Sequence, residues 1–334
     1  MFGDIQMNIN GYILKSELKN ANSGFSKWGF ATKNGKEYFI KELINPVYPI
    51  NKDVMTEKLF CERRNYCFLY VKKFKKIFEK INNVSRGNLI RVNEFFRYGS
   101  RYYLITEKVG GEFVNVKKIS VSEEYKKLLL LKTAAQSFMD LHSAGIVHFD
   151  VKPSNILVKI SKNGNYTAKV IDFDSGFFKG DILDVDELGG DLTYLAPETF
   201  LGIIGENVII DEKADIFALG LVFHEYWCGK LPYFNKNEYE YPYETVLDGN
   251  ALMPDLTCIP DKVGKIICDM LSIDPKQRPS AEEIIAGLNE FSTCEEITDA
   301  DIKQYKNNAE TDVVLSPKPI EPKKGDWFTQ AGDL

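Results

Sequence analysis

The segment IVHFDVKPSNILV, residues 146–158, places charged side chains between apolar residues of the kind that form buried strands. Asp150, Lys152 and Asn155 follow one another closely, so a short loop between two strands would bring a carboxylate, a cation and an amide together. Burying an unpaired carboxylate costs several kcal/mol, and a charged surface turn does not explain the apolar flanks. We therefore predict a functional site in this loop.

Composition narrows the class of protein. The chain has 334 residues, of which 44% are hydrophobic, and its formal net charge is −6. These values are typical of a soluble globular protein of one or two domains, and the small net charge favours neither a nucleic acid nor an anionic membrane as partner. The most apolar later stretch, residues 216–228, is too short to cross a bilayer and contains His224 and Glu225. We expect no nucleic-acid partner and no membrane partner.

The cysteines and the start of the chain bear on localisation. The spacing of the cysteines includes no close CxxC pair, which disfavours a zinc site and a disulfide framework. The six are Cys61, Cys67, Cys228, Cys258, Cys268 and Cys294. The opening MFGDIQMNIN has no basic segment followed by an apolar run, so we expect no signal peptide. Both observations favour reduced thiols and a cytoplasmic location.

Hydrophobic patterning predicts a β-rich first part with one long helix. Asn34-Gly35 separates two apolar, aromatic-rich runs in KWGFATKNGKEYFIKEL, a strong hairpin signal. LIRVNEFF and RYYLITEKV predict a second strand pair. Between the two pairs, residues 55–81 have apolar side chains at helical spacing. These are Phe60, Cys67, Val71, Phe74, Phe78 and Ile81.

The rest of the chain predicts a helical part and a tail. After Gly110-Gly111 the pattern is mainly helical, apart from residues 146–158 and the strand-like YTAKVIDFD. A β-rich part, a glycine joint and an α-rich part predict a cleft for a ligand. Residues 292–334 are polar and contain three prolines near position 320, which predicts a flexible tail. Trp327 and Phe328 near its end suggest a docking partner or, more simply, a loosely packed end.

Five segments in order resemble motifs of the eukaryotic-type (Hanks-type) protein kinase family. HFDVKPSN resembles the catalytic loop H-R-D-x-K-x-x-N, DFD resembles D-F-G, YLAPE resembles A-P-E, and ADIFALG resembles D-x-W-x-x-G. Arg278 in DPKQRPS matches the late arginine that the family pairs with the A-P-E glutamate, here Glu198. The resemblance covers about residues 12–291, and Lys152 favours a divergent member of the Ser/Thr branch.

The resemblance implies an α+β fold of two lobes. The N-lobe, about 12–107, would contain an antiparallel β-sheet and one long helix. A hinge at 107–111 would lead to a mainly α C-lobe at 112–291. Together they would form a protein kinase domain over residues 12–291.

The resemblance also implies ATP and Mg²⁺ as cofactors and a protein substrate with a Ser or Thr acceptor. Asp150 would accept or orient the proton of the substrate hydroxyl, and Lys152 would stabilise the transferring phosphate. Asn155 and Asp172 would ligate Mg²⁺. Lys41, on the strand FIKEL, would hold the α- and β-phosphates. The histidine of the catalytic loop would support it structurally.

The nucleotide base would bind at the hinge. Thr106 would be the gatekeeper residue. The backbone groups of Glu107 and Val109 would contact the base, which would lie between Leu18 and Leu157.

The loop expected to cover the phosphates departs from G-x-G-x-x-G. Counting back from Lys41, Gly24 falls at the third glycine, whereas Lys19 and Ala21 occupy the first two positions. This gives the backbone less freedom to approach phosphate, although polar side chains would add donors. The nucleotide contacts implied here are Asn20, Ala21, Asn22, Ser23 and Gly24.

Four other positions depart from the family pattern. Phe39 stands where the family has a small alanine above the adenine, and Asp174 replaces the glycine of D-F-G. Phe149 replaces the arginine of H-R-D, which normally receives a phosphorylated activation loop, so we predict activity that needs no such phosphorylation. Asp191 replaces a threonine, and an ion pair between Asp191 and Lys152 would substitute for its contact.

The helix glutamate that the family pairs with Lys41 stays open. Glu57 and Glu62 suit the distance along the chain from Lys41, and Glu79 suits the distance to the next strand. Helical phase does not decide among them.

Two alternatives to a Ser/Thr protein kinase remain. The loop and VIDFD also resemble the small-molecule aminoglycoside phosphotransferases, but those enzymes lack the A-P-E segment, the D-x-W-x-x-G helix and the late arginine. A pseudokinase scaffold would explain the missing glycines, Phe39 and Asp174. We favour ATP-dependent phosphorylation of Ser or Thr because Lys41, Asp150, Asn155 and Asp172 are all present.

Overall fold

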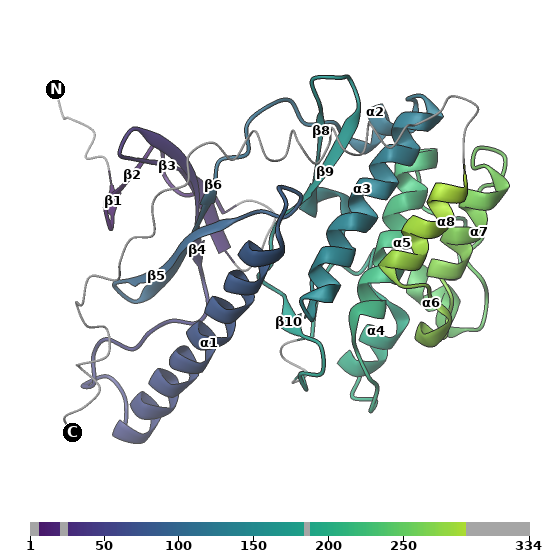
Figure 1. The fold of residues 1–334 in the computed structure, drawn as a ribbon. Helices are drawn as coiled ribbons and strands as arrows, with labels where there is room; N and C mark the ends of the chain where they lie inside the picture. The colour runs from purple at the N-terminus through teal and green to yellow at the C-terminus, as the bar shows by residue number, and fades with distance from the viewer. Residues whose placement is uncertain (1–6, 21–25, 184–187, 292–334) are drawn as a thin grey trace. The chain divides into compact units, whose positions relative to one another are not determined.

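The computed structural model describes residues 7–20, 26–183 and 188–291, shown in colour in Figure 1. All described residues lie in one compact unit, Met1–Glu296. The predicted tail, with Trp327 and Phe328, lies outside the described residues.

A six-stranded antiparallel sheet of order β1-β2-β3-β4-β6-β5 forms the first part of this unit. Its strands are β1 Asn8–Ile9, β2 Tyr12–Leu14, β3 Ser26–Lys33, β4 Lys36–Leu43, β5 Val92–Tyr98 and β6 Arg101–Glu107. Asn34 and Gly35 join β3 to β4 with φ values of 53° and 75°. A tight hairpin turn needs positive φ at both positions, so the predicted hairpin is present.

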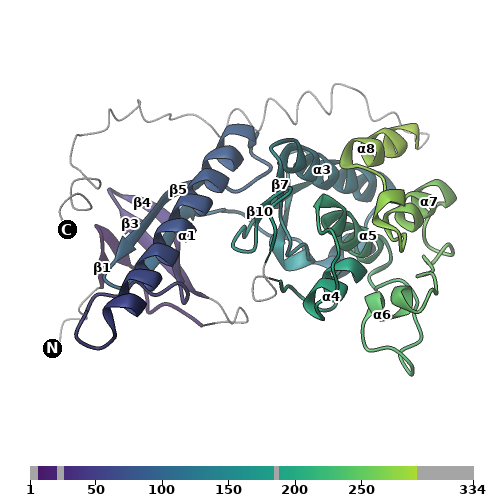
Figure 2. The same ribbon diagram turned by 90° about the horizontal axis from the view of Figure 1, so that it is seen from below.

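One long helix, α1 Glu57–Val84, packs beside β5 (Figures 1 and 2). The Thr56 hydroxyl caps it by accepting a hydrogen bond from the Leu59 amide at 3.3 Å. The predicted helix is thus present and slightly longer than expected. Its buried side chains are Phe60, Cys67, Phe74, Ile77, Phe78 and Ile81, whereas Val71 is half-buried.

Two short sheets frame the segment with the predicted site. β7 Ile146–Val147 pairs with β10 Phe177–Phe178, and β8 Ile156–Ile160 pairs with β9 Tyr166–Val170. The chain between β7 and β8 contains a single 3₁₀ turn, Pro153–Asn155. The charged loop is therefore anchored on both sides by strands, as its apolar flanks predicted.

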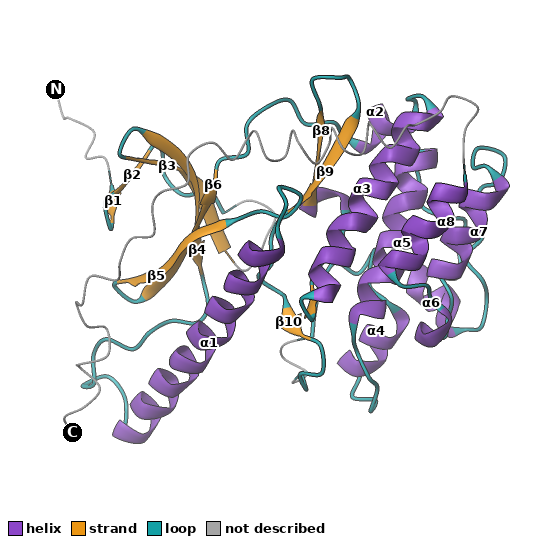
Figure 3. Cartoon of the chain, in the orientation of Figure 1, coloured by secondary structure: helices purple, strands orange, loops and turns teal. Residues whose placement is uncertain are grey.

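The second part of the unit is mainly helical, as the purple ribbons of Figure 3 show. Its helices are α2 Val116–Ser120, α3 Glu124–Ser143, α4 Pro197–Ile203, α5 Glu212–Cys228, α6 Pro242–Leu247, α7 Asp261–Met270 and α8 Ala281–Glu290. A short 3₁₀ turn, Pro275–Gln277, precedes α8. α5 is buried over nearly its whole length and packs against α2, α3 and α7. The fold class is α+β, as predicted.

Cys228 and Cys258 form a disulfide, so the expectation of reduced thiols is wrong for this pair. They are 30 positions apart in sequence and meet because the end of α5 packs against the loop before α7. The indole of Trp227 donates a hydrogen bond to the Cys258 carbonyl at 2.8 Å and fixes this contact. Spacing alone does not reveal such a tertiary contact.

None of the described helices combines the length and the apolar character that crossing a bilayer requires.

Candidate active site

A buried carboxylate of α5 holds the backbone of the charged loop. Asp215, which is 1% exposed, accepts hydrogen bonds from the backbone amides of His148 and Phe149, each at 2.8 Å. Phe149 has a φ of 67°, a left-handed conformation that costs energy for a side chain of this size. The two charge-assisted hydrogen bonds offset that cost and fix the start of the loop.

The Phe149 side chain has an apolar environment. Its ring lies edge-on to Phe177 with ring centroids 5.1 Å apart, in a cluster that includes Val147. An arginine here would place a guanidinium among these groups. Phenylalanine in place of the arginine of H-R-D therefore fits the apolar packing at this position.

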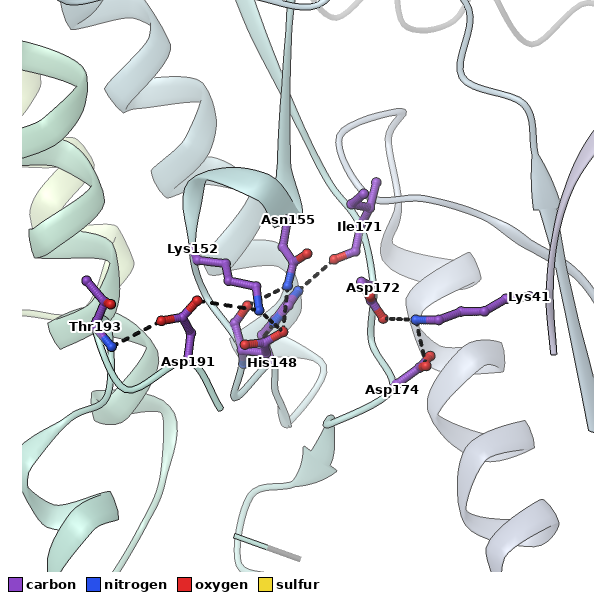
Figure 4. A network of polar contacts seen from close by, with 10 residues as sticks. Lys41, His148, Lys152, Asn155, Ile171, Asp172, Asp174, Asp191 and Thr193 are labelled. Carbon is purple, nitrogen blue, oxygen red and sulfur yellow. Dashed lines mark hydrogen bonds and ion pairs between the residues drawn. The ribbon is translucent and has the colours of Figure 1, made fainter. Parts of the chain in front are cut away.

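His148 links the loop to the segment after β9. Its Nε2 lies 2.9 Å from the Ile171 carbonyl, so this nitrogen is the donor, and Nδ1 accepts the Asp150 amide at 3.3 Å. The ring packs against Phe173 at 5.0 Å and is fully buried. Both ring nitrogens are thus used to hold backbone in place (Figure 4).

Asp150, Lys152 and Asn155 converge as their spacing predicted. Asn155 Nδ2 donates to Asp150 Oδ2 at 2.8 Å and to the Asp150 carbonyl at 2.8 Å. Lys152 Nζ lies 3.0 Å from the same Oδ2. An amide and a cation therefore hold the same carboxylate oxygen of Asp150.

The expected ion pair of Lys152 and Asp191 is present, but its distance of 4.0 Å between Nζ and Oδ2 is longer than the 3.0 Å between Lys152 and Asp150 (Figure 4). The other Asp191 oxygen accepts the Thr193 amide at 3.1 Å. Lys152 is therefore held more strongly by Asp150 than by Asp191.

A second charged cluster joins β4 to the segment after β9. Lys41 Nζ lies 2.7 Å from Asp172 Oδ1 and 2.7 Å from Asp174 Oδ2 (Figure 4). Lys41 is only 7% exposed, and the backbone of Asp172 is left-handed, with a φ of 65°. Strained backbone of this kind occurs at functional sites where the surrounding structure enforces it.

Charge and burial shift the pKa values of this cluster. Burial alone would lower the pKa of Lys41, but the carboxylates of Asp174 and Asp172 raise it above its ordinary value. Burial would raise the pKa of Asp172, yet the ammonium of Lys41 lowers it. Burial raises the pKa of Asp174 to about 6, because the attraction of Lys41 is offset by the repulsion of Asp172.

The structure brings none of the three candidate helix glutamates to Lys41. Glu57, Glu62 and Glu79 are exposed on α1, and no ion pair in the described ranges joins Lys41 to that helix. The aromatic side of α1 faces the sheet, with Phe78 packed on Phe95 at 5.4 Å. The carboxylates consequently face away.

Of the residues expected to contact the nucleotide base, Thr106 and Glu107 lie in β6 and Leu157 lies in β8, whereas Val109 follows the end of β6. Thr106 is buried in β6 and directly opposite Phe39 of β4. Glu107 ends β6, and its side chain pairs with Lys169 at 2.5 Å. Val109 and Leu157 are half-buried.

The N-terminal side of the expected nucleotide site is partly described. Leu18 is half-buried and packs against the cluster of Ile9, Tyr12 and Leu14, whereas Asn20 is exposed. Ala21, Asn22, Ser23 and Gly24 lie outside the described residues.

The Phe39 ring belongs to an aromatic group on the sheet. It stacks on Trp28 at 5.7 Å and lies edge-on to Phe30 at 5.9 Å. The large side chain of Phe39 is thus held in place by the rings of Trp28 and Phe30.

Sequence reasoning missed the supporting role of Asp215. The signal was available, because Asp215 is the acid of ADIFALG at the start of a buried helix. A buried acid needs hydrogen-bond donors. Which groups donate to Asp215 depends on how α5 packs against the charged loop, and here they are the backbone amides of His148 and Phe149.

Known proteins are similar to this chain over most of the described part. The family described as protein kinase domain matches residues 70–287. A serine/threonine-protein kinase of Drosophila melanogaster is 28% identical over 222 residues, which cover 65% of this chain and 28% of that protein. A probable myosin light chain kinase of Dictyostelium discoideum is 27% identical over 212 residues, 62% of this chain and 66% of that protein. A serine/threonine-protein kinase of Mus musculus is 26% identical over 215 residues, 61% of this chain and 26% of that protein. The similarity therefore spans only part of the length of each relative.

Proposed function

Because this chain belongs to the protein kinase domain family, we propose that it transfers the γ-phosphoryl group of ATP to Ser or Thr hydroxyls of protein substrates. The observation that carries the proposal is the convergence of Asp150, Lys152 and Asn155 in one anchored loop. The similar proteins from fly and mouse, which are named serine/threonine-protein kinases, support the choice of acceptor.

Asp150 suits the role of orienting the acceptor hydroxyl. One of its oxygens, Oδ2, binds both Asn155 and Lys152, so the carboxylate has a fixed direction. The other oxygen can accept a proton from a hydroxyl placed within hydrogen-bond distance. Lys152, beside it, supplies positive charge near the transferring phosphoryl group.

Two residues of the site, one in the loop before β8 and one after β9, offer oxygen atoms suited to Mg²⁺. Asn155 uses its Nδ2 for Asp150, which leaves its side-chain oxygen for a hard cation, and Asp172 supplies a carboxylate. No group of three or more His, Cys, Asp or Glu suited to a metal occurs in the described ranges. Phosphate oxygens and water would complete the shell, as is usual for Mg²⁺. When bound, the ion would neutralise charge on the phosphates.

Lys41 suits the role of holding the nucleotide phosphates. Its ammonium is buried, keeps its charge through two carboxylates, and faces the segment that carries Asp172. In phosphoryl transfer most of the catalytic effect comes from positioning and charge, so this fixed cation contributes directly.

Transfer from radiolabelled ATP with Mg²⁺ to a basic protein substrate tests the proposal. Asp150→Asn and Asp172→Asn should each abolish incorporation into Ser and Thr, whereas Asp261→Asn, at an exposed site on α7, should not. Absence of transfer from wild-type protein that still binds ATP would favour a scaffold. Transfer to a small molecule alone would favour the phosphotransferase alternative.

A further inference from the structure

Lys41 has two carboxylate partners, and both come from the segment after β9. Asp172 and Asp174 each lie 2.7 Å from its Nζ. We propose that Asp174 is the positioning residue for Lys41 and takes the place of the helix glutamate of other protein kinases. The inference rests on the proposed function, in which Lys41 binds nucleotide phosphates.

A second partner is needed because Asp172 has another proposed task. If Asp172 turns its oxygens toward Mg²⁺, its attraction for Lys41 weakens. A buried ammonium without a partner is costly, so Lys41 would lose its fixed position. Asp174 keeps one carboxylate on Lys41 while Asp172 serves the cation.

The packed side of helix α1 is aromatic rather than acidic. Tyr70 packs on Phe74, with ring centroids 4.5 Å apart, in the cluster of Leu43, Cys67 and Tyr102. Burial and, after it, the negative charge of Asp174 raise the pKa of Tyr70. Among the described residues, the ion pairs of Lys41 are with Asp172 and Asp174 and not with this helix.

This arrangement removes a link between α1 and the lysine. A lysine held by a helix glutamate is in place only when the helix is. Here the partner follows Asp172 by two residues, so the same short segment positions both the expected Mg²⁺ ligand and Lys41. Displacement of α1 should therefore leave the Lys41 pair intact.

A double-mutant cycle on nucleotide binding tests the inference without requiring transfer. The variants are Asp174→Asn, Lys41→Met and their combination, and the readout is the Kd for ATP with Mg²⁺ measured by titration calorimetry. Asp174→Asn should weaken binding about tenfold, as loss of one charge-assisted partner does. In the Lys41→Met background the same change should have no further effect. Asp174→Glu should restore most of the affinity because it keeps the charge.

Matched controls come from α1. Glu62→Gln and Glu79→Gln change exposed carboxylates of the helix and should leave the Kd unchanged. A loss of affinity in either one would show that a helix glutamate serves Lys41, and would overturn the inference. A full effect of Asp174→Asn in the Lys41→Met background would overturn it too, because Asp174 would then act on the metal or the nucleotide.

The outcomes separate this inference from the proposed function. Coupling between Lys41 and Asp174 in ATP binding, together with no phosphoryl transfer, would refute the proposed function. It would still support the inference that Asp174 positions Lys41. Phosphoryl transfer by the wild-type protein, with unchanged ATP affinity in Asp174→Asn, would support the proposed function. It would refute the positioning role of Asp174. Wild-type protein that binds no ATP would refute both.

Discussion

Arg278 and Glu198, 80 residues apart in the chain, form a buried bidentate ion pair with distances of 2.6 Å and 2.8 Å. Arg278 is 1% exposed, and it also donates to the carbonyls of Ser272 and Lys213 at 2.9 Å and 2.8 Å. Its guanidinium lies over the Phe217 ring at 4.9 Å. The pair joins the first turn of α4 to the segment before α8, as the family motif implied.

Removing one partner of this pair should destabilise the fold strongly. Arg278→Met leaves Glu198 buried without its cation, and we expect a loss of about 3 to 5 kcal/mol in the free energy of unfolding, measured with urea. The control is Lys265→Met, which breaks an exposed pair with Asp269 on α7 and should destabilise the fold far less, because solvent screens such a pair. Equal losses in the two variants would contradict the prediction.

The two contacts of Lys152 predict a graded effect on catalysis. Asp150 lies 3.0 Å from its Nζ and Asp191 lies 4.0 Å away. Lys152→Met should lower kcat by about 10²-fold or more, since it removes charge beside the transferring group, while Asp191→Asn should lower it much less. Neither change touches Lys41, so the KM for ATP should stay close to wild type. Steady-state kinetics measure kcat and KM in both variants. A larger loss of kcat in Asp191→Asn than in Lys152→Met would refute the prediction.

Activity should not depend on phosphorylation of the activation segment. Phe149 packs against Phe177 in an apolar cluster, so it offers no cation to a phosphate. Tyr194, one hydroxyl of that segment, already donates to Glu225 at 2.6 Å. Phosphatase-treated protein, verified by mass spectrometry, should transfer phosphate at the same rate as untreated protein. A marked fall in rate after treatment would contradict this.

His224 should make stability depend on pH. Burial lowers its pKa below the ordinary 6.5, against a hydrogen bond to the Lys230 carbonyl and the charge of Asp255, which raise it. Its Nδ1 lies 2.7 Å from that carbonyl, and Nε2 accepts the Asp255 amide at 3.0 Å, an arrangement that requires the neutral ring. The unfolded chain takes up a proton as the pH falls through 6.5, whereas the folded chain does so only at lower pH. Stability is therefore complete above 6.5 and declines below it, by at most about 1.4 kcal/mol per pH unit.

Urea unfolding at pH 7.5, 6.5 and 5.5 measures this effect. His224→Gln loses hydrogen bonds and stability at every pH, but it should show a smaller decline between pH 6.5 and 5.5 than the wild-type protein. Identical slopes would mean that other groups cause the decline.

Local features of this protein were predictable because neighbours in sequence must be neighbours in space. Asp150, Lys152 and Asn155 belong to one loop between β7 and β8, which leaves their side chains little room to separate. Asn34 and Gly35 fix a hairpin through their own backbone preferences. For the same reason the apolar spacing over residues 55–81 predicted the helix that the structure has at Glu57–Val84.

The partner of Lys41 depended on tertiary structure. Asp172 lies 131 positions from Lys41 in sequence, and the choice between helix carboxylates and Asp174 depends on how α1 is rotated. Packing of its aromatic side chains on the sheet sets that rotation, and it directs Glu57, Glu62 and Glu79 outward. The Cys228–Cys258 disulfide has the same origin, because it follows from how α5 meets a distant loop. The sequence determined which groups the site contains, and long-range packing decided which of them pair.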